Sequence, residues 1–547
     1  MAGYNGVINL GSFASQTVLQ RDMRSGNPAG AWTVSYGNGW AVVNLTATPT
    51  VQFQSLEYRV RAASAPIGPP LLDWTSCSTS QTAGAVSFRI VLPAALEWLF
   101  LDVRANGDMS KMETTGPLGV GEVIAASGQS LASDFWSTIA TKDTTTLASC
   151  GITPSPYGVC YASWDGNAPP AAGSPWLTPI DGGTYQSAFC AEFLRLATLG
   201  TGVNCALIGY SWSGEPIASW RTDGSGPKDV WSPLVATLDN AVGNGGKLGT
   251  LIWMHGHNDA RIPQAGVDGD ELTADKYLAA LATLITALAT RYSGYPFRRV
   301  LSSIPAIGSN WVTTTPRFDP GFIQQIRSAH LQFAAGDSLT LGHVDGLDTT
   351  LWSDQTHPSQ SGNVIFARHF YRAFMAGIAP SLYTSGDTGA QITGAASRAA
   401  GTAQVYVHIA HTGGTTLTCS GGATGAATQF QVFNSGSTAA SDAIAVQSVD
   451  FSRPNTIAIS LASIPPDTQA LDVWYRLPPD GNATLLGTNQ IYDDNLSGSS
   501  TDALLTGRQL AVQPRAATVP APARPRPLFT APGVPLNVGP LLTGLSA

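Results

Sequence analysis

The middle of this chain alternates short apolar runs with longer amphipathic stretches, and this alternation constrains the fold more than any other feature of the sequence. The short runs are typical of buried strands, and the longer stretches are typical of helices with one apolar face. Strands that alternate with helices favour a parallel sheet covered by helices on both faces. We therefore expect an α/β fold with strands at 122–126, 204–209, 248–255, 299–304 and 338–341 and helices at 184–199, 273–292, 320–334 and 362–376.

The two flanks of this region have a different pattern. The chain has 547 residues, more than one hydrophobic core supports, since single cores stop growing at roughly 250–300 residues. Residues 1–115 and 381–512 contain short β-branched or alternating runs separated by Gly, Pro, Ser, Thr and Asn, which is typical of antiparallel β-domains. We predict an N-terminal β-sandwich over 1–115, the α/β core over 116–380 and a C-terminal β-domain over 381–512.

The last residues, 513–547, are rich in proline. Proline donates no backbone hydrogen bond, so this tail is not expected to form a helix or a central strand. We interpret it as a flexible end or as a segment that packs in a homo-oligomer or a larger particle.

Composition excludes several classes of partner. The net charge is −8 and no run of Lys or Arg occurs, so nucleic acid is not an expected partner. The longest apolar helix-like stretch, 277–288, is shorter than the ~18–20 residues of a membrane span, so no membrane insertion is expected. Charged residues make up 12% of the chain, about half the usual share of ~25%. This composition is typical of β-rich extracellular or virion proteins.

The N-terminus and the cysteines bear on the compartment. Met1 is not followed by a basic and then an apolar segment, so no secretory signal peptide is expected in this sequence. The six cysteines form no C-x-x-C pair, and they are interpreted equally as up to three disulfides or as buried free thiols. We expect an extracellular or virion-associated protein.

Ser130 is the first candidate for chemistry. Gly128-Gln129-Ser130 follows the strand predicted at 122–126 and precedes a helix predicted over 131–140. Ligands bind at the carboxyl ends of strands in open α/β sheets, and a helix N-terminus favours a developing oxyanion. We interpret Ser130 as a nucleophile. The alternative is a helix N-cap.

Asp354 and His357 form a candidate acid-base pair just before the helix predicted at 362–376. An Asp three residues before a His can place its carboxylate on imidazole Nδ1, which leaves Nε2 to take the proton of a serine. The alternative is a polar loop in which Asp354 is a local cap.

Two further strand ends carry candidate oxyanion donors. Gly256-His257-Asn258 closes the strand at 248–255, and the Asn258 amide could donate to an oxyanion, or the segment could be a simple turn. Gly214, after the strand at 204–209, offers a backbone N–H. The same strand end also contains a competing nucleophile, Ser211, because Gly209 to Ser213 nearly matches the G-x-S-x-G elbow of α/β-hydrolases, with Ser213 in place of the last Gly.

In chain order, the segments at Ser130, Gly214, Asn258 and Asp354 to His357 resemble the four sequence blocks of the SGNH hydrolases. More narrowly, Gly128-Gln129-Ser130, the S-W-S-G-E-P-I-A-S-W segment at 211–220 and Asp-x-x-His-Pro at 354–358 are similar to sialate O-acetylesterase and related carbohydrate acetylesterases. The T-V-L-Q-R-D-M segment at 17–23 is also similar to the N-terminal stretch of that family. The chain departs from its pattern at Leu131, where the family has Asn, at Gly256-His257-Asn258, where it favours G-E-S, and at Ser213-Gly214, where it has Gly-Gly.

The resemblance implies a flavodoxin-like three-layer α/β/α core that removes O-acetyl groups from carbohydrate. It implies a Ser130, Asp354 and His357 triad and an oxyanion hole made of the Ser130 and Gly214 amides and the Asn258 side chain, with no cofactor. Gln129, Trp136 and Trp212 are expected to contact an acetylated glycan. His255 and His257 have no third ligand at a recognised spacing, so no metal is expected.

Two other interpretations stay open at this point. The chain could be an α/β-hydrolase that uses Ser211. It could also be a virion or cell-surface structural protein, for example a phage tail component, in which an esterase-like domain binds glycan.

Overall fold

The structure is a computed structural model. It describes residues 4–11, 13–23, 38–137, 143, 145–243, 246–260, 274–292, 296–302, 320–344, 356–380, 391–411, 415–419, 421–435, 437, 440–475, 491–493, 510–511 and 516–519. The chain divides into two compact units, one formed by residues 1–305 and 325–387 and the other by residues 306–324 and 388–547.

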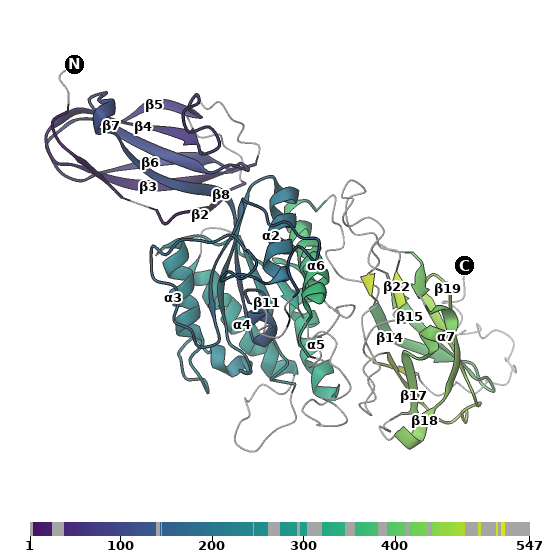
Figure 1. Cartoon of the computed structure of the whole chain (residues 1–547). Coiled ribbons are helices and arrows are strands. Elements are labelled where there is room, and N and C mark those ends of the chain that lie inside the picture. Colours follow the sequence, from purple (N-terminus) through teal and green to yellow (C-terminus); the bar gives the residue numbers. More distant parts are fainter. Residues whose placement is uncertain are drawn as a thin grey trace, which may run out of the picture. The chain divides into compact units, whose positions relative to one another are not determined.

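The first unit begins with a β-sandwich. One sheet has the order β1-β3-β6, and the antiparallel strands β5, β4 and β7 belong to the sheet that faces it across a common core (Figure 1). Their bounds are β1 (Ile8–Leu10), β3 (Trp40–Pro49), β4 (Phe53–Ala62), β5 (Leu72–Gln81), β6 (Val86–Pro93) and β7 (Leu99–Ala105). Every second residue of β3 enters this core, because Ala41, Val43, Leu45 and Ala47 are at most 4% exposed.

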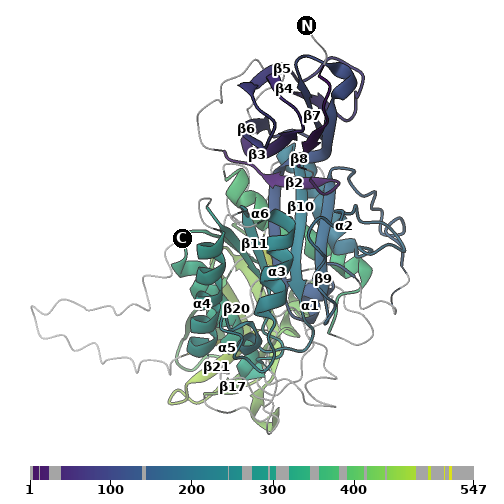
Figure 2. The same cartoon turned by 90° about the vertical axis from the view of Figure 1, so that its left-hand side faces the viewer.

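One long strand, β8 (Glu113–Gly128), continues from the sandwich into the α/β part (Figure 2). Its first half pairs antiparallel with β7 and parallel with β2 (Thr17–Gln20). Its second half pairs parallel with β10 (Asn204–Ser211) and β11 (Thr250–Met254). The boundary predicted between residues 115 and 116 therefore falls inside a strand, and the two parts share one sheet.

A buried ion pair lies at this junction. Arg21 Nε donates to Glu122 Oε1 at 2.7 Å, and their side chains are 2% and 0% exposed. Gln20 completes the cluster, since its Nε2 donates to Glu122 Oε2 at 3.1 Å and its Oε1 accepts the Val123 N–H at 2.7 Å. The V-L-Q-R segment thus fixes the N-terminal chain to the strand that leads to Ser130.

The second half of β8 is the centre of a parallel sheet with the order β9-β10-β8-β11-β12-β13. Figure 1 shows α3 and α4 on one face of this sheet and α2 and α6 on the other. The bounds are β9 (Gly158–Trp164), β12 (Arg298–Ser302), β13 (Thr340–Val344), α2 (Ala188–Thr201), α3 (Trp231–Val242), α4 (Ala274–Arg291), α5 (Pro320–Gly336) and α6 (Gln360–Ile378). The predicted α/β class is confirmed, whereas β9 and α3 were not predicted.

The second unit is mainly antiparallel. Its larger sheet has the order β18-β17-β21-β24-β14-β15-β20-β19, and its smaller sheet has the order β16-β22-β23. The bounds are β14 (Gln391–Arg398), β15 (Gln404–Ala410), β16 (Leu417–Cys419), α7 (Gly422–Ala427), β17 (Phe430–Asn434), β18 (Ala443–Ile444), β19 (Val446–Arg453), β20 (Thr456–Leu461), β21 (Leu471–Tyr475), β22 (Ile491–Asp493), β23 (Leu510–Ala511) and β24 (Ala516–Val519).

The prediction that the Pro-rich tail forms no central strand is wrong for β24. This strand lies inside the larger sheet, where it pairs antiparallel with β21 and parallel with β14. Its sequence, A-A-T-V, contains no proline, so every residue keeps the N–H that a central strand needs.

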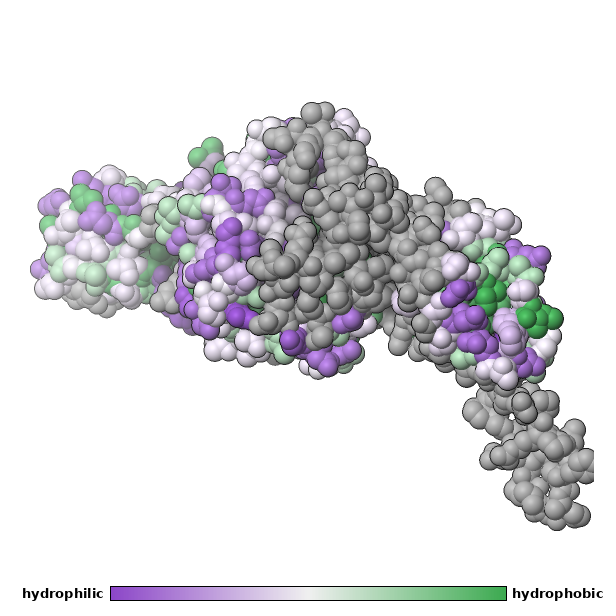
Figure 3. Space-filling model, turned by 90° about the horizontal axis from the view of Figure 1, so that it is seen from below, coloured by the Kyte–Doolittle hydropathy of each residue, from purple (hydrophilic) through white to green (hydrophobic). Residues whose placement is uncertain are grey.

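All six cysteines are free thiols, and Cys160, Cys190 and Cys205 are buried. The structure therefore favours the second of the two interpretations of the cysteines. None of the described helices is both long enough and apolar enough to span a membrane. Figure 3 shows hydrophilic and hydrophobic residues interspersed over the described surface of the face that it presents.

Candidate active site

The carboxyl ends of three parallel strands meet where the strand order reverses. Gly128, the last residue of β8, pairs with Ser211 of β10 on one side and with Met254 of β11 on the other. Such a switch point is where open α/β sheets bind ligands. Ser130 follows two residues after Gly128. The structure thus places Ser130 at the site that the topology favours.

Gly128 is required by the backbone at this point. Its φ is +147°, and a Cβ atom there would lie 1.8 Å from the carbonyl oxygen of Met254. A residue with a side chain would be strained by its conformation and would also collide with the neighbouring strand. The glycine of the G-Q-S motif therefore allows the chain to turn out of the sheet beside β11.

The helix predicted over 131–140 is a single turn, α1 (Ser130–Ser133), followed by non-helical turns in the described residues up to 137. A single turn has only a small macrodipole. The prediction that a helix dipole at Ser130 helps to stabilise the oxyanion is therefore corrected. The local donor is retained. The Ser130 N–H is the first of the turn, and it donates no hydrogen bond within the described residues.

Gln129 ties Ser130 to the end of β11. Its Oε1 accepts the backbone N–H groups of Gly256 and Asn258, both at 3.2 Å. Its side chain is buried, with 2% exposure for the residue. Gln129 was predicted to contact substrate, but in this conformation its side chain lies beneath the Gly256 to Asn258 turn and holds that turn beside Ser130.

His357 comes close to the same turn. It lies three residues before the start of α6, whose N-cap Ser359 accepts the Gly362 N–H. The pKa of His257 is lowered to about 3, first because the ring is buried and then because of the nearby charge of His357. The turn that carries Asn258 therefore also lies near His357.

Contacts at the start of α6 help to bring His357 to this edge. Gln360 Oε1 accepts the N–H of Ala188, the first residue of α2, at 2.8 Å. The N-cap of α2, Ser187, donates its hydroxyl to the carbonyl of Asp134, just after α1. The end of α1 and the beginnings of α2 and α6 are thus joined. No hydrogen bond connects Ser130 with His357 among the described residues, and Asp354 lies outside them.

The Gly214 loop lies on the other side of Ser130. The Trp212 N–H donates to the Gly128 carbonyl at 3.1 Å, and the Ser213 N–H donates to Asp165 Oδ1 at 2.7 Å. Gly214 itself is exposed, with a φ of +76°. These contacts place the loop at the same strand ends, and they leave the Gly214 amide as its next backbone donor.

The geometry of Ser211 differs from that of a nucleophile elbow. Ser211 is the last residue of β10, still paired with β8 and β9, rather than the apex of a strand-to-helix turn. It is fully buried, and its hydroxyl lies 3.1 Å from that of Ser133. The structure therefore argues against the α/β-hydrolase interpretation, because an elbow serine must expose its Oγ.

The two tryptophans predicted to contact glycan are in different environments. Trp136 is fully buried, with its ring edge-on to Phe135, so it belongs to the core. Trp212 is half-buried, and Lys228 Nζ lies 3.6 Å from the centre of its ring. A sugar that stacked on this face of Trp212 would have to displace Lys228.

Asp165 is a polar residue of this edge that the sequence reasoning missed. It follows β9, is exposed, and has a φ of +50°, which is uncommon for a residue other than glycine. Its Oδ1 accepts the Ser133 hydroxyl at 3.2 Å as well as the Ser213 N–H. The Asp-Gly-Asn segment after a β-rich apolar run was the signal that could have identified this strand end.

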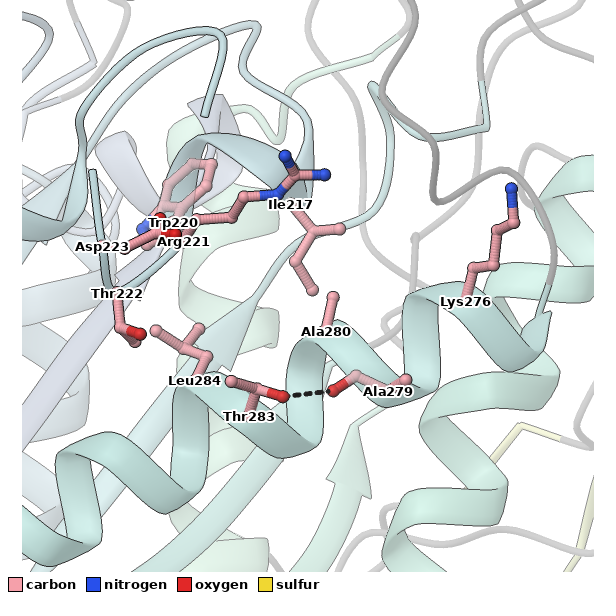
Figure 4. Close-up of a pocket in the computed structure, with 10 residues that line it drawn as sticks. All are labelled: Ile217, Trp220, Arg221, Thr222, Asp223, Lys276, Ala279, Ala280, Thr283 and Leu284. Carbon is pink, nitrogen blue, oxygen red and sulfur yellow. Dashed lines mark hydrogen bonds between the residues drawn. The ribbon is translucent and has the colours of Figure 1, made fainter. Parts of the chain in front are cut away.

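The described residues contain no group of three or more His, Cys, Asp or Glu side chains that could hold a metal ion. A cavity of about 660 Å³ lies between η2 (Ile217–Trp220) and α4 (Figure 4). Ser130, Asn258 and His357 do not line it. One residue of its lining is bonded to the Asn258 turn, because the Ile217 N–H donates to Asp259 Oδ1 at 3.0 Å.

Comparisons with known proteins agree with this architecture. No protein-family model matches the chain, and no curated protein matches its sequence. A carbohydrate acetylesterase from Xanthomonas citri matches the structure with a TM-score of 0.56 over 93% of this chain and 99% of that one, at 14% identity. Two weaker matches cover about half of this chain. A protein from Arabidopsis thaliana matches with a TM-score of 0.34 over 47% of this chain and 98% of that one, at 16% identity. An acetyl xylan esterase from Geobacillus stearothermophilus matches with a TM-score of 0.28 over 48% of this chain and 96% of that one, at 17% identity.

The match to the Xanthomonas citri enzyme includes both flanking β-regions as well as the α/β core, since it covers nearly all of both chains. At this level of identity the likeness concerns the fold. The predicted resemblance is confirmed in that sense: this chain has the fold of a carbohydrate acetylesterase.

Proposed function

We propose that this protein is a serine esterase of the SGNH type that removes acyl groups, acetyl above all, from carbohydrate. The observation that carries the proposal is the position of Ser130 at the switch point, where Gln129 holds the Asn258 turn beside it. The strand order supports the core type. If β8, β10, β11, β12 and β13 are numbered 1 to 5, their order is 2-1-3-4-5, as in flavodoxin-like folds, with β9 added at the edge.

In the proposed mechanism, Ser130 Oγ attacks the acyl carbonyl carbon while His357 Nε2 takes the hydroxyl proton. Asp354 accepts the Nδ1–H of His357 and keeps the imidazole in the reactive tautomer. The negative charge that develops on the carbonyl oxygen is stabilised by the Ser130 N–H, the Gly214 N–H and the Asn258 side-chain amide.

Collapse of the tetrahedral intermediate breaks the bond to the sugar oxygen, which leaves with the proton from His357. Water then attacks the acyl-enzyme, with His357 as general base, and releases acetate and the free serine. The hydrogen bond between Ser130 and His357 would form in the substrate complex, because catalytic hydrogen bonds are often long in the free enzyme and tighten with substrate bound.

The choice of carbohydrate as the substrate class rests on the fold shared with the Xanthomonas citri enzyme over almost the entire chain, together with the motifs at Ser130 and His357. The experiment compares Ser130→Ala and Ser211→Ala with the wild type in the hydrolysis of p-nitrophenyl acetate. Ser130→Ala should abolish turnover with an unchanged circular dichroism spectrum. Ser211→Ala should retain it, because that hydroxyl is buried against Ser133.

Loss of activity in Ser211→Ala with retention in Ser130→Ala would refute the assignment of the nucleophile. The carbohydrate part is tested separately by measuring acetate release from a panel of O-acetylated polysaccharides and O-acetylated sialic acid. If the enzyme hydrolyses p-nitrophenyl acetate but none of the acetylated sugars at a comparable kcat/KM, carbohydrate is not its substrate class.

A further inference from the structure

A buried row of polar side chains lies directly behind the Asn258 turn. His255 Nδ1 is 3.1 Å from the hydroxyl of Tyr277 on α4, and the same hydroxyl is 3.1 Å from His330 Nε2 on α5. The other nitrogen of His255, Nε2, is 3.1 Å from the backbone carbonyl of Glu215. All three side chains of the row are essentially inaccessible to solvent.

The direction of these hydrogen bonds follows from the protonation states. Burial lowers the pKa of His255 well below its usual range, and the nearby His330 lowers it further, so its ring is neutral and has one N–H. A carbonyl oxygen can only accept, so that N–H must be on Nε2, facing Glu215. Nδ1 is then an acceptor for the Tyr277 hydroxyl, whose pKa is raised by burial and by Asp259, and the Tyr277 oxygen accepts from His330 Nε2.

Two aromatic rings hold the imidazole plane. The Trp253 ring stacks on it with centroids 5.1 Å apart, and the Trp220 ring meets it edge-on at 4.6 Å. These contacts therefore fix both the tautomer and the orientation of His255, and the Glu215 carbonyl accepts its Nε2–H.

The segments that this arrangement joins are the two that carry the proposed oxyanion donors other than Ser130. Glu215 follows Gly214 directly. On the β11 side, His255 leads into the Gly256 to Asn258 turn, and Asp259 at the end of that turn accepts the Ile217 N–H. Asp259 Oδ2 also lies 3.4 Å from His255 Nδ1, which is long for a hydrogen bond. His255 and Asp259 thus hold the Gly214 loop to the Asn258 turn at two points.

We infer that His255 is a positioning residue of the esterase site, which sets the Gly214 amide relative to the Asn258 amide through its hydrogen bond to the Glu215 carbonyl. The inference rests on the proposed function, since it assigns these two donors to one oxyanion. Tyr277 and His330 act through His255, because the Tyr277 hydroxyl, which accepts from His330, donates to Nδ1 and so supports the tautomer that the Glu215 carbonyl requires.

The test uses the full-length protein and p-nitrophenyl acetate, with kcat and KM measured separately. In His255→Leu the donor to Glu215 is lost, and kcat should fall ~10- to 100-fold with KM changed less than about twofold, since misplaced oxyanion donors affect the transition state more than substrate binding. His255→Gln should recover most of this loss, because its amide N–H can donate to Glu215 and its amide oxygen can accept from Tyr277.

Tyr277→Phe provides a second variant that keeps the shape of the core. It should lower kcat by about threefold or more at constant KM, because Nδ1 loses its donor and the tautomer and orientation of His255 are then held by the Glu215 carbonyl without the support of the phenol. Tyr292→Phe is the matched control, since Tyr292 is also buried and lies just beyond the end of the same helix, and the change removes its phenol hydrogen bond to Asp239 Oδ1. It should leave kcat within about twofold of the wild type, a difference of about 0.4 kcal/mol in activation free energy.

Wild-type kcat in both His255→Leu and Tyr277→Phe would overturn the inference, and so would a His255→Gln variant as impaired as His255→Leu. In either case an active wild type and an inactive Ser130→Ala variant would leave the proposed function standing. An inactive wild type would instead contradict the proposed function. The two failures are therefore distinguishable.

Discussion

Replacing Arg21 by Met should destabilise the first unit by about 3–5 kcal/mol, the usual cost of removing one partner of a buried ion pair. The structure supports a value in this range. Arg21 and Glu122 are 2% and 0% exposed and 2.7 Å apart, and opposite charges about 4 Å apart attract by about 4 kcal/mol at an effective dielectric constant of ~20. Without Arg21, the Glu122 carboxylate would keep the Gln20 amide, a side-chain partner that carries no compensating charge.

Urea unfolding followed by tryptophan fluorescence measures this loss as a shift in midpoint at constant slope. The matched control is Arg104→Met, which breaks the more exposed pair with Glu57 (17% and 24% exposed), and which should cost at most about 1 kcal/mol. The double variant Arg21→Met/Glu122→Leu should be much more stable than the sum of the single changes, because it leaves no buried charge behind. A loss below 1 kcal/mol in Arg21→Met, or additive effects in the double variant, would refute the reasoning.

Three further predictions concern the buried histidines and the G-Q-S turn. Burial lowers the pKa values of His257 and His330 to about 3 in the folded protein, below the unfolded value of ~6.5. Below pH 6.5 the unfolded chain therefore binds protons that the folded protein does not, and the free energy of unfolding should fall by about 1.4 kcal/mol per pH unit for each histidine until pH 3, whereas above pH 6.5 it should be at its full value. A urea midpoint that does not fall between pH 7 and pH 5 would contradict this. Gln129→Leu should lower kcat for p-nitrophenyl acetate by ~10²-fold with little change in the melting temperature, since it frees the Asn258 turn. Gln404→Leu, at an exposed position, is its control. An unaltered kcat in Gln129→Leu would count against the role of Gln129. Gly128→Ala should lower the melting temperature far more than Gly173→Ala, which has a φ of +83° but open space around a Cβ atom, and equal shifts would argue against the collision with Met254.

The main elements of the parallel sheet could be predicted because buried strands and amphipathic helices leave a periodic apolar pattern. Two elements were missed for local reasons. The strand Gly158–Trp164 starts with glycine, which is unfavourable in strands. The helix Trp231–Val242 has Pro233 near its start, which discourages a helix prediction although proline is tolerated in a first turn. The continuity of β8 was also hidden, because Pro117 suggests a break, whereas a bulge opposite β7 accommodates it.

The candidate site could be predicted as residue types at strand ends but not as contacts. Nothing in the sequence indicates that Gln129 bonds to the backbone of the Asn258 turn, or that Trp136, eight residues after the strand end, is fully buried. The helix expected after Ser130 ends at Ser133 because tertiary contacts compete with helix propensity there: the Ser133 hydroxyl bonds to Asp165, and the Asp134 carbonyl accepts from Ser187. Such contacts between distant segments depend on the folded arrangement.

The strand β8 makes the N-terminal sandwich part of the scaffold of the site rather than an attached module. Sixteen residues of extended chain, roughly 50 Å long at ~3.3 Å per residue, join the core of the sandwich to the turn that carries Ser130 without an intervening linker. Recombination of the sandwich at residue 115 would therefore cut the strand on which the proposed nucleophile depends.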